Sequence, residues 1–183
     1  MIADALTPVQ RRALVELARQ AAARAAAGEA PADPGPAPDG LDRPAAAFVT
    51  LRVARELKGC IGSFEARRSL WLTVSEMATA AASRDPRFAP LAPGDLGALA
   101  IEISVLSPAR RVEGPADIEI GRHGLEVRRG WRRGLLLPQV ATDHRLDRET
   151  FLGETCRKAG LPKDAWRRAG TEVSVFEAEV FGD

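Results

Sequence analysis

The sequence contains no tyrosine, and it has only two cysteines and two histidines among its 183 residues. Cys60 and Cys156 lie far apart and form no Cys-x-x-Cys pair. The soft ligands are therefore too few, and at the wrong spacings, for a zinc site. We expect no metal and no other cofactor, and without a secretion signal we expect no disulfide.

The chain also lacks an excess of charge of either sign and any long apolar run. Its 26 basic and 25 acidic residues give a net charge of +1, which provides no broad field for wrapping nucleic acid or lying on an anionic membrane. No stretch approaches the roughly 18 consecutive apolar residues that span a bilayer. The N-terminus has no basic region followed by an apolar run. We therefore expect a cytoplasmic protein that does not bind membranes.

The first 44 residues combine a helical segment with a connector. Leucines and alanines at helical spacing predict a helix over Leu6–Ala27, with Thr7 as its N-cap and Gly28 at its end. Glu29–Pro44 is rich in proline and glycine. Such a segment cannot hold a helix or a sheet ladder, so we expect an extended connector.

Alternation of apolar and polar residues then predicts strands. Phe48–Val53 and Leu57–Phe64 flank a short stretch that favours a hairpin. An apolar stripe predicts a helix over Leu70–Ser83, which must end before Pro86. Leu99–Leu106 alternates again and predicts a third strand.

The second half repeats this order of elements. Leu125–Arg128 and Leu135–Leu137 flank an expected turn that contains Gly130 and Gly134. A helix over Arg148–Ala159 follows, with Asp147 and Gly160 as its caps, and then a strand over Glu172–Phe181.

One short match supports an internal duplication of hairpin, helix, turn and strand. Glu102-Ile103-Ser104-Val105-Leu106 is similar to Glu172-Val173-Ser174-Val175-Phe176. The sequence therefore predicts an α+β protein of two related lobes, with antiparallel sheets flanked by helices and an additional N-terminal helix. We expect residues 1–44 to precede a first lobe over 45–110 and a second over 111–183. A groove between such lobes is a common place for a ligand.

The best candidate site is Leu57-Lys58-Gly59-Cys60-Ile61-Gly62. Strand alternation places Cys60 and Lys58 on the face opposite Ile61. If the hairpin turn is symmetric, Thr50 and Arg52 lie beside Cys60 and Lys58. Nearby cations lower the pKa of a thiol and favour the nucleophilic thiolate.

Gly59 and Gly62 lack side chains, so a substrate or a partner backbone could approach the Cys60 thiol closely. The alternative is that Cys60 is a small buried filler and the glycines only relieve crowding. We expect Cys156, on an apolar helix face, to be such a filler.

Three further groups are candidates for chemistry. His123 lies on a glycine-flanked loop, where it could serve as the base for Cys60 with Asp85 as the orienting group, or be an ordinary turn residue. Asp85 and Arg87 could form an anion-binding or docking corner, although a structural role in the turn is favoured. Arg128–Arg133 surrounds Trp131 with arginines and could contact nucleic acid, but a charged hairpin tip is the commoner explanation.

Several ordered blocks resemble the AMMECR domain family, whose hallmark motif is similar to residues 57–62. The later blocks, in the same order, are Asp85-Pro86-Arg87-Phe88 with Pro90-Leu91, Glu102–Leu106, His123-Gly124-Leu125, Leu137-Pro138-Gln139-Val140 and Cys156–Leu161. The departures are small: Lys58 stands where arginine is more usual, and the turn at Val53–Glu56 lacks a glycine. The resemblance covers nearly the whole chain.

The resemblance implies an α+β fold of two related lobes. It also implies the bacterial and archaeal AmmeMemoRadiSam system, in which a similar protein accompanies a Memo-type protein and a radical S-adenosylmethionine enzyme. It supplies no reaction.

The leading interpretation is a component of a redox or modification pathway, with Cys60 as nucleophile or covalent carrier and His123 as base. Thr50, Arg52, Lys58, Gly59, Gly62, Asp85, Arg87 and Gln139 are the candidate binding residues. The rival is a non-catalytic module that docks on those partner proteins, on a peptide or on a small molecule.

Overall fold

The computed structural model describes residues 5–183 and divides the chain into two compact units. The first unit runs to Leu106 and also includes Glu179–Asp183, while the second unit is Ser107–Ala178. Each unit has its own sheet of four strands and its own hydrophobic core. The C-terminal strand therefore belongs to the first unit.

Helix α1 (Pro8–Ala26) confirms the predicted N-terminal helix. Thr7 is extended, and its hydroxyl accepts a hydrogen bond from the Gln10 amide, which completes a capping box. Gly28 adopts a φ of 72° just beyond the helix, where a residue with a Cβ atom would be strained. The connector after it forms no helix and only a single bridge, between Pro44 and Ser69, as expected from its prolines.

Strands β1 (Ala46–Val53) and β2 (Glu56–Ser63) form the predicted hairpin. Its two turn residues, Ala54 and Arg55, have φ values of 48° and 73°. This is the left-handed geometry that two-residue hairpin turns require and that glycine or asparagine usually supplies. Helix α2 (Leu70–Ser83), the short 3-10 helix η1 (Pro93–Ala98) and β3 (Leu99–Leu106) complete the series.

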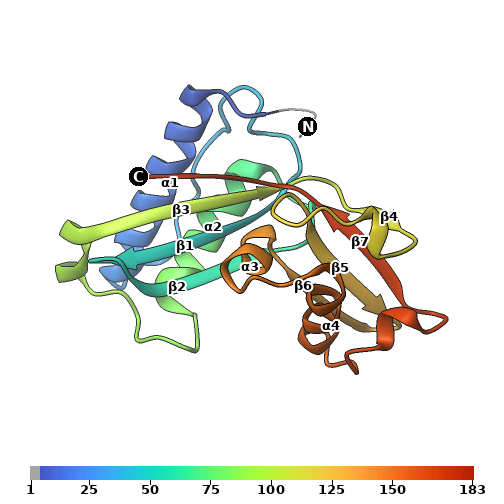
Figure 1. Cartoon of the computed structure of the whole chain (residues 1–183). Helices are drawn as coiled ribbons and strands as arrows, with labels where there is room; N and C mark the ends of the chain where they lie inside the picture. Colours follow the sequence, from blue (N-terminus) through green and yellow to red (C-terminus); the bar gives the residue numbers. More distant parts are fainter. Residues whose placement is uncertain (1–4) are drawn as a thin grey trace. The chain divides into compact units, whose positions relative to one another are not determined.

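The first sheet has the order β2-β1-β3-β8, and α1 and α2 pack on one of its faces (Figure 1). Val49 and Leu51 of β1 and Ile103 of β3 are fully buried against Leu14 of α1 and Val74 of α2. Because side chains alternate along a strand, the neighbouring residues Phe48, Thr50 and Cys60 point to the opposite face. That face carries the candidate site.

The second unit contains a three-residue strand, a second hairpin and two helices. Its strands are β4 (Arg110–Val112), β5 (Gly124–Arg129), β6 (Arg132–Leu136) and β7 (Glu172–Phe176). Its helices are α3 (Pro138–Asp143) and α4 (Arg148–Lys158), with 3-10 turns η2 (Pro115–Asp117) and η3 (Ala165–Arg167). Asp147 caps α4 through the Thr150 amide, as predicted.

Two predictions for the second half are wrong. Gly134 lies within β6 opposite Val127, and not in the turn. It faces the end of α4, where a Cβ atom would overlap Ala159, so packing and not turn geometry explains this glycine. The predicted single strand Glu172–Phe181 is two strands. The chain leaves the second sheet after Phe176 and enters the first sheet as β8 (Ala178–Gly182).

Three strands of each sheet share one order, which agrees with two related lobes. The first sheet places the hairpin and the following strand in the order β2-β1-β3, and the second sheet places β6-β5-β7 in the same way. Glu102–Leu106 lies in β3 and Glu172–Phe176 is β7, so the two similar pentapeptides occupy the corresponding strand of each sheet.

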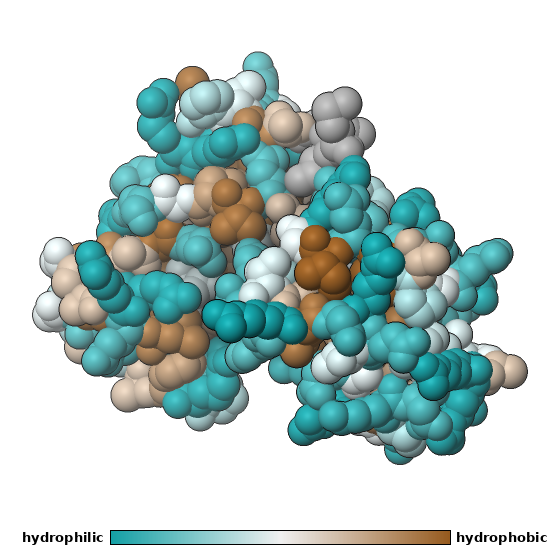
Figure 2. Space-filling model, viewed as in Figure 1, coloured by the Kyte–Doolittle hydropathy of each residue, from teal (hydrophilic) through white to brown (hydrophobic). Residues whose placement is uncertain are grey.

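The surface of the chain carries mainly hydrophilic side chains in the view of Figure 2, with hydrophobic residues in small scattered patches. Many of the charges are paired, for example Arg11 with Glu179 at 2.7 Å and Arg167 with Glu149 at 2.7 Å. Among residues 5–183, none of the helices has the length and apolar character needed to cross a membrane.

Candidate functional site

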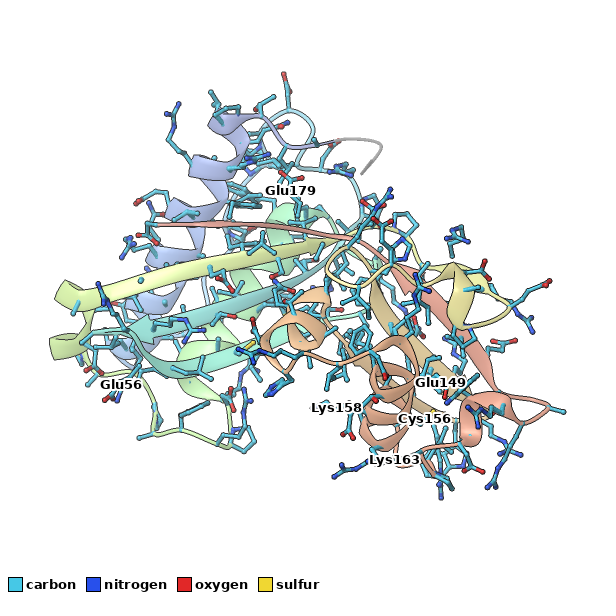
Figure 3. All side chains as sticks on the ribbon, in the orientation of Figure 1. Glu56, Glu149, Cys156, Lys158, Lys163 and Glu179 are labelled. Carbon is cyan, nitrogen blue, oxygen red and sulfur yellow. The ribbon has the colours of Figure 1, made fainter. Side chains whose placement is uncertain are left out.

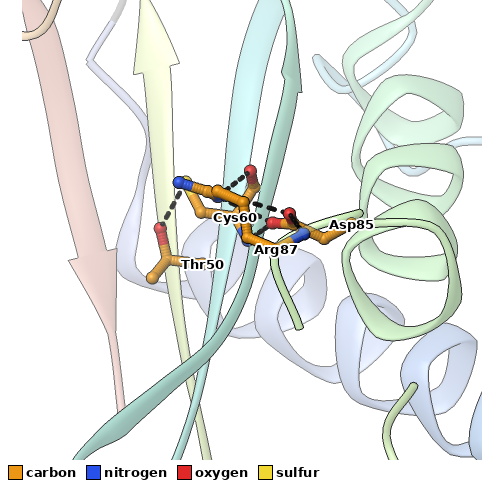
Figure 4. Close-up of polar contacts among 4 residues, drawn as sticks. All are labelled: Thr50, Cys60, Asp85 and Arg87. Carbon is orange, nitrogen blue, oxygen red and sulfur yellow. Dashed lines mark hydrogen bonds and ion pairs between the residues drawn. The ribbon is translucent and has the colours of Figure 1, made fainter. Parts of the chain in front are cut away.

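Cys60 lies in the middle of β2, the strand at the edge of the first sheet. Its register partner on β1 is Thr50, as the sequence predicts. The Thr50 hydroxyl donates a hydrogen bond to the Cys60 Sγ atom at 3.3 Å (Figure 4). The Cys60 side chain is partly exposed on the face opposite the helices, and the thiol is free.

Asp85 and Arg87 bind the backbone of Cys60 from the open side of the edge strand. The Cys60 amide donates to Asp85 Oδ2 at 2.9 Å, and Arg87 Nη2 donates to the Cys60 carbonyl oxygen at 3.1 Å. A neighbouring strand would normally satisfy such a pair of main-chain groups. The two side chains thus replace the missing strand at this residue.

The Asp85–Arg87 pair is a two-point ion pair with one buried end. Arg87 Nε donates to Asp85 Oδ1 at 2.9 Å and Arg87 Nη2 donates to Asp85 Oδ2 at 2.7 Å (Figure 4). The Asp85 side chain is 2% exposed, whereas the Arg87 side chain is 56% exposed. Arg87 lowers the pKa of Asp85 well below its usual range although burial opposes this, and Asp85 raises the pKa of Arg87.

The predicted pairing of Arg52 with Lys58 is wrong. The register between β1 and β2 shifts after Leu51, so Arg52 pairs with Leu57 and Lys58 is the additional residue of a bulge. The Lys58 ammonium lies 3.8 Å from the Glu56 carboxylate. The cation that contacts Cys60 is instead Arg87, through the backbone carbonyl.

The protein's own atoms fill the space beside Gly59 and Gly62. Gly59 lies on the helix face of the sheet, where a Cβ atom would overlap the Ala81 carbonyl of α2. At Gly62 a Cβ atom would overlap the ring of Phe48, its partner on β1. Both glycines are therefore explained by internal packing, and neither leaves open space for a ligand.

His123 lies in the second unit, just before β5, and it is buried, contrary to the expectation of an exposed loop residue. Its Nδ1 atom accepts a hydrogen bond from the Glu119 amide at 3.0 Å, and its own amide donates to the Glu119 carbonyl at 2.9 Å. Burial lowers the pKa of His123, and the nearby Arg122 lowers it further. The neutral ring therefore ties a turn together.

Gln139, in the first turn of α3, has a buried side-chain oxygen with no hydrogen-bond partner among residues 5–183. A buried acceptor in this state is uncommon, because the loss of its bond to water is not compensated. Only the AMMECR-like block Leu137–Val140 pointed to Gln139, and nothing in the local pattern predicts its burial.

Cys156 lies in α4 (Figure 3). It is fully buried and packs with Val127 and Leu161, as expected of a core residue. Burial raises the pKa of the Cys156 thiol. The two cysteines therefore differ sharply in access to solvent, and Cys60 is the one that a reagent can reach.

The arginine cluster at the tip of the second hairpin is largely engaged within the protein. Arg133 pairs with Glu126 at 2.7 Å, and Arg132 donates to the Gly160 carbonyl at 2.6 Å. Trp131 is 89% exposed, and the Arg132 guanidinium lies 5.3 Å from its ring centre. This arrangement agrees with a charged, solvated hairpin tip. Within the described residues, no three His, Cys, Asp or Glu side chains are grouped so as to hold a metal ion.

These observations define an α+β protein with a single accessible thiol on an edge strand, held by a threonine hydroxyl and an aspartate–arginine pair. The AMMECR1 family model matches residues 15–181. The chain belongs to the AMMECR1 family.

The relatives are archaeal proteins and are similar over most of their length. A protein of Methanothermobacter thermautotrophicus is 46% identical over 154 residues, which cover 81% of this chain and 80% of that protein. A protein of Methanosarcina acetivorans is 39% identical over 187 residues, covering 96% and 92%. The crystal structure of the uncharacterized protein PH0010 from Pyrococcus horikoshii has a TM-score of 0.89 and 37% identity, covering 97% of this chain and 93% of that one.

Proposed function

We propose that this protein binds a small acidic compound at the Cys60 cluster, formed by Thr50, Cys60, Asp85 and Arg87, and that Cys60 acts on it as a nucleophile or covalent carrier. The resemblance to the AMMECR domain family suggests that this happens within an AmmeMemoRadiSam-type pathway of redox or modification chemistry. The observation that carries the proposal is the accessible thiol of Cys60. It accepts a hydrogen bond from the Thr50 hydroxyl, and the guanidinium of Arg87 is fixed beside it by a hydrogen bond to the Cys60 carbonyl.

The chemistry of the cluster supports a nucleophile. The Thr50 hydroxyl donates a hydrogen bond to sulfur, and this contact fixes the orientation of the Cys60 side chain. The thiolate would form a bond to an electrophilic carbon of the compound, while the leaving group departs with the bonding electron pair. The thiol proton passes to solvent, since Asp85 is held as an ionised partner of Arg87 and is a poor base.

The remaining capacity of Arg87 supports an acidic ligand. Its Nε and Nη2 atoms are used by Asp85 and the Cys60 carbonyl, whereas its Nη1 atom has no partner among residues 5–183. An arginine with free donors and a fixed orientation is well suited to a carboxylate or phosphate. The proposed site excludes His123, whose Nδ1 atom already accepts a hydrogen bond from Glu119.

The test compares alkylation of Cys60 by neutral iodoacetamide and anionic iodoacetate across a pH series, followed by intact mass and peptide mapping. Buried Cys156 serves as the internal reference for unfolded protein. We expect Cys60 to react about tenfold faster than a free thiol at pH 7, and Thr50→Val to slow it where Thr50→Ser does not.

Arg87 is tested by the ratio of the two rates. We expect Arg87→Gln to lower the rate with iodoacetate relative to iodoacetamide, because it removes the anion-binding donor. The double variant Asp85→Asn/Arg87→Gln controls for an unpaired Asp85. A Cys60 no faster than a free thiol rejects the nucleophile, and an unchanged ratio rejects the anion site.

We infer a second candidate, a non-catalytic docking module for the Memo-type or radical enzyme partner or for a peptide. Its support is the position of β2 at the edge of the first sheet, where a partner segment could pair with the strand. In a pull-down with the partner proteins, docking predicts that Cys60→Ala retains binding. Loss of binding with Cys60→Ala and with Cys60→Ser would contradict it.

A further inference from the structure

The second unit contains a cavity of about 630 Å³ formed by β6, α3, α4 and the loop between the two helices. All of its lining residues lie between residues 136 and 158, so it belongs to this unit alone. Its floor consists of Leu136, Val140 and Leu146, which are half-buried and continue the hydrophobic core around Phe151. The volume is in the range of small-molecule sites, and an apolar floor with a few polar groups is their usual lining.

The rim of the cavity is positively charged. It carries His144, Glu154, Arg157 and Lys158. Glu154 is already paired, because it accepts hydrogen bonds from Arg157 at 3.0 Å and lies 3.1 Å from the Lys163 ammonium. Lys163 lowers the pKa of Glu154, as does the charge of Arg157, so the carboxylate stays ionised and bound to its two partners.

Lys158 has no such partner. It is the last residue of α4 (Figure 3), it is exposed, and its side chain makes no hydrogen bond or ion pair within residues 5–183. The side chain of His144, at the other side of the rim, also makes none in this part of the chain. Two free nitrogen donors, Lys158 and His144, thus border the apolar floor, and the one carboxylate of the rim, Glu154, is already paired with cations.

We propose that this cavity binds a small monocarboxylic acid with an aliphatic or aromatic body. The body packs on Leu136, Val140 and Leu146, and the carboxylate pairs with Lys158 and accepts from His144. The charge on the rim selects an anion, and the floor requires that the anion carry an apolar group. This site lies outside the Cys60 cluster and does not depend on the function proposed for it.

The experiment is a methyl NMR titration of the full chain with hexanoate, hexanamide and inorganic phosphate. Hexanamide has the same apolar body without the charge, and phosphate has charge without the body. We expect hexanoate to shift the methyl signals of Leu136, Val140 and Leu146 in a saturable manner. Hexanamide and phosphate are expected to bind at least about tenfold more weakly.

Two variants test the assigned contacts. Lys158→Gln removes the unpaired cation and is expected to weaken hexanoate about tenfold, whereas Val140→Phe fills the floor and is expected to abolish the methyl shifts of Leu136 and Leu146. Arg168→Gln is the matched control, because it removes a cation of the same unit that pairs with Asp164 away from the cavity. Thermal unfolding verifies that each variant is folded.

The outcomes separate the proposal from its alternatives. Equal affinity for hexanoate and hexanamide would show a merely apolar cavity, and equal affinity for phosphate would show a simple anion site. Either result overturns the proposal, as does a Lys158→Gln variant with unchanged affinity or a set of shifted methyl signals outside the cavity.

Discussion

At the scale of single residues, Asp85 has the most consequential position. Its buried carboxylate accepts from the Cys60 amide and holds the Arg87 guanidinium, which in turn donates to the Cys60 carbonyl. The Asp85 side chain therefore fixes the Arg87 guanidinium and also provides the hydrogen-bond acceptor for the Cys60 amide on the open side of β2. This role is both structural and chemical. The contacts that satisfy the main-chain groups of Cys60 also orient the N–H donors of Arg87 next to the thiol.

We predict that Asp85→Asn lowers the free energy of unfolding by about 2 kcal/mol at pH 7. The ionised carboxylate is buried, but Arg87 is half exposed, so solvent screens part of the interaction. The measurement is urea unfolding. Asp39→Asn is the control, because the exposed Asp39 carboxylate makes no hydrogen bond or ion pair within residues 5–183, and we expect it to cost less than about 0.5 kcal/mol.

The Asp85 contribution also depends on pH. The folded state lowers the pKa of Asp85 below the value of about 3.9 that an unfolded chain has. Stability from this group is therefore fully present above about pH 5 and is lost as the pH falls through the folded pKa. The difference between wild type and Asp85→Asn should be constant from pH 7 to 5 and shrink below about pH 4. A difference that persists unchanged at lower pH would contradict an ionic origin.

Much of the site could be predicted from single residues, but the contacts between residues far apart in the sequence could not. Alternation correctly gave the face of Cys60 and its neighbour Thr50, because period two is a property of any strand. The Arg52–Lys58 pairing failed because a bulge, which depends on how β2 meets α2 and β1, is not visible in the pattern. The contact of Arg87 with Cys60 joins residues 27 apart, and no local signal predicts it.

At the scale of elements, the close approach of α2 to the first sheet depends on Gly59. The Ala81 carbonyl of α2 occupies the space where a side chain at position 59 would be. The small side chains of the alanines in α2 also allow the helix to lie close to the sheet. The second unit uses Gly134 in the same way beneath the end of α4. In both units a glycine in a hairpin strand sets the distance between the sheet and its covering helix.

We predict that Gly59→Ala destabilises the first unit by about 1–3 kcal/mol, because helix and strand must separate to admit the methyl group. Thermal unfolding measures the loss. Gly94→Ala, at a glycine whose added Cβ atom would meet nothing, is the control and is expected to change stability by less than about 0.5 kcal/mol. Equal effects of the two substitutions would contradict the packing explanation.

Regular elements were predictable where one physical signal dominated. The helices α1, α2 and α4 and the strand β3 combine caps with clear periodicity, and their predicted bounds are confirmed to within two residues. The short elements β4 and α3 escaped prediction, since three to six residues carry too little periodicity. The predicted strand Glu172–Phe181 combined β7 and β8 into one element, because the alternation of apolar residues continues across the point where the chain passes from one sheet to the other.

At the scale of the whole molecule, the second unit is an insertion between two neighbouring strands of the first. β3 ends at Leu106, and β8, which borders it, begins at Ala178. Glu179 of the returning strand then accepts hydrogen bonds from Arg11 Nε of α1 at 2.8 Å and from the amide of Leu6, just before α1, at 3.2 Å. The first unit is thus closed by the last residues of the chain.

We predict that deleting Glu179–Asp183 loosens the first unit and spares the second. The Ile101 amide donates to Asp183 Oδ1 at 2.8 Å, so its hydrogen exchange should accelerate about tenfold or more without β8. Amides shared by β5 and β7 should keep their protection and act as the internal control. Faster exchange in both units to the same extent would contradict this assignment of β8.

The late return of β8 has a consequence for synthesis on the ribosome. Most of the first unit emerges first, but its edge strand follows the entire second unit in the order of translation. The nascent first sheet must therefore present the free side of β3 until β8 arrives, whereas all the strands of the inserted unit are already available. The unit that begins later in the sequence can complete its fold earlier, and a chain stalled before residue 178 would expose β3 to pairing with a neighbouring nascent chain.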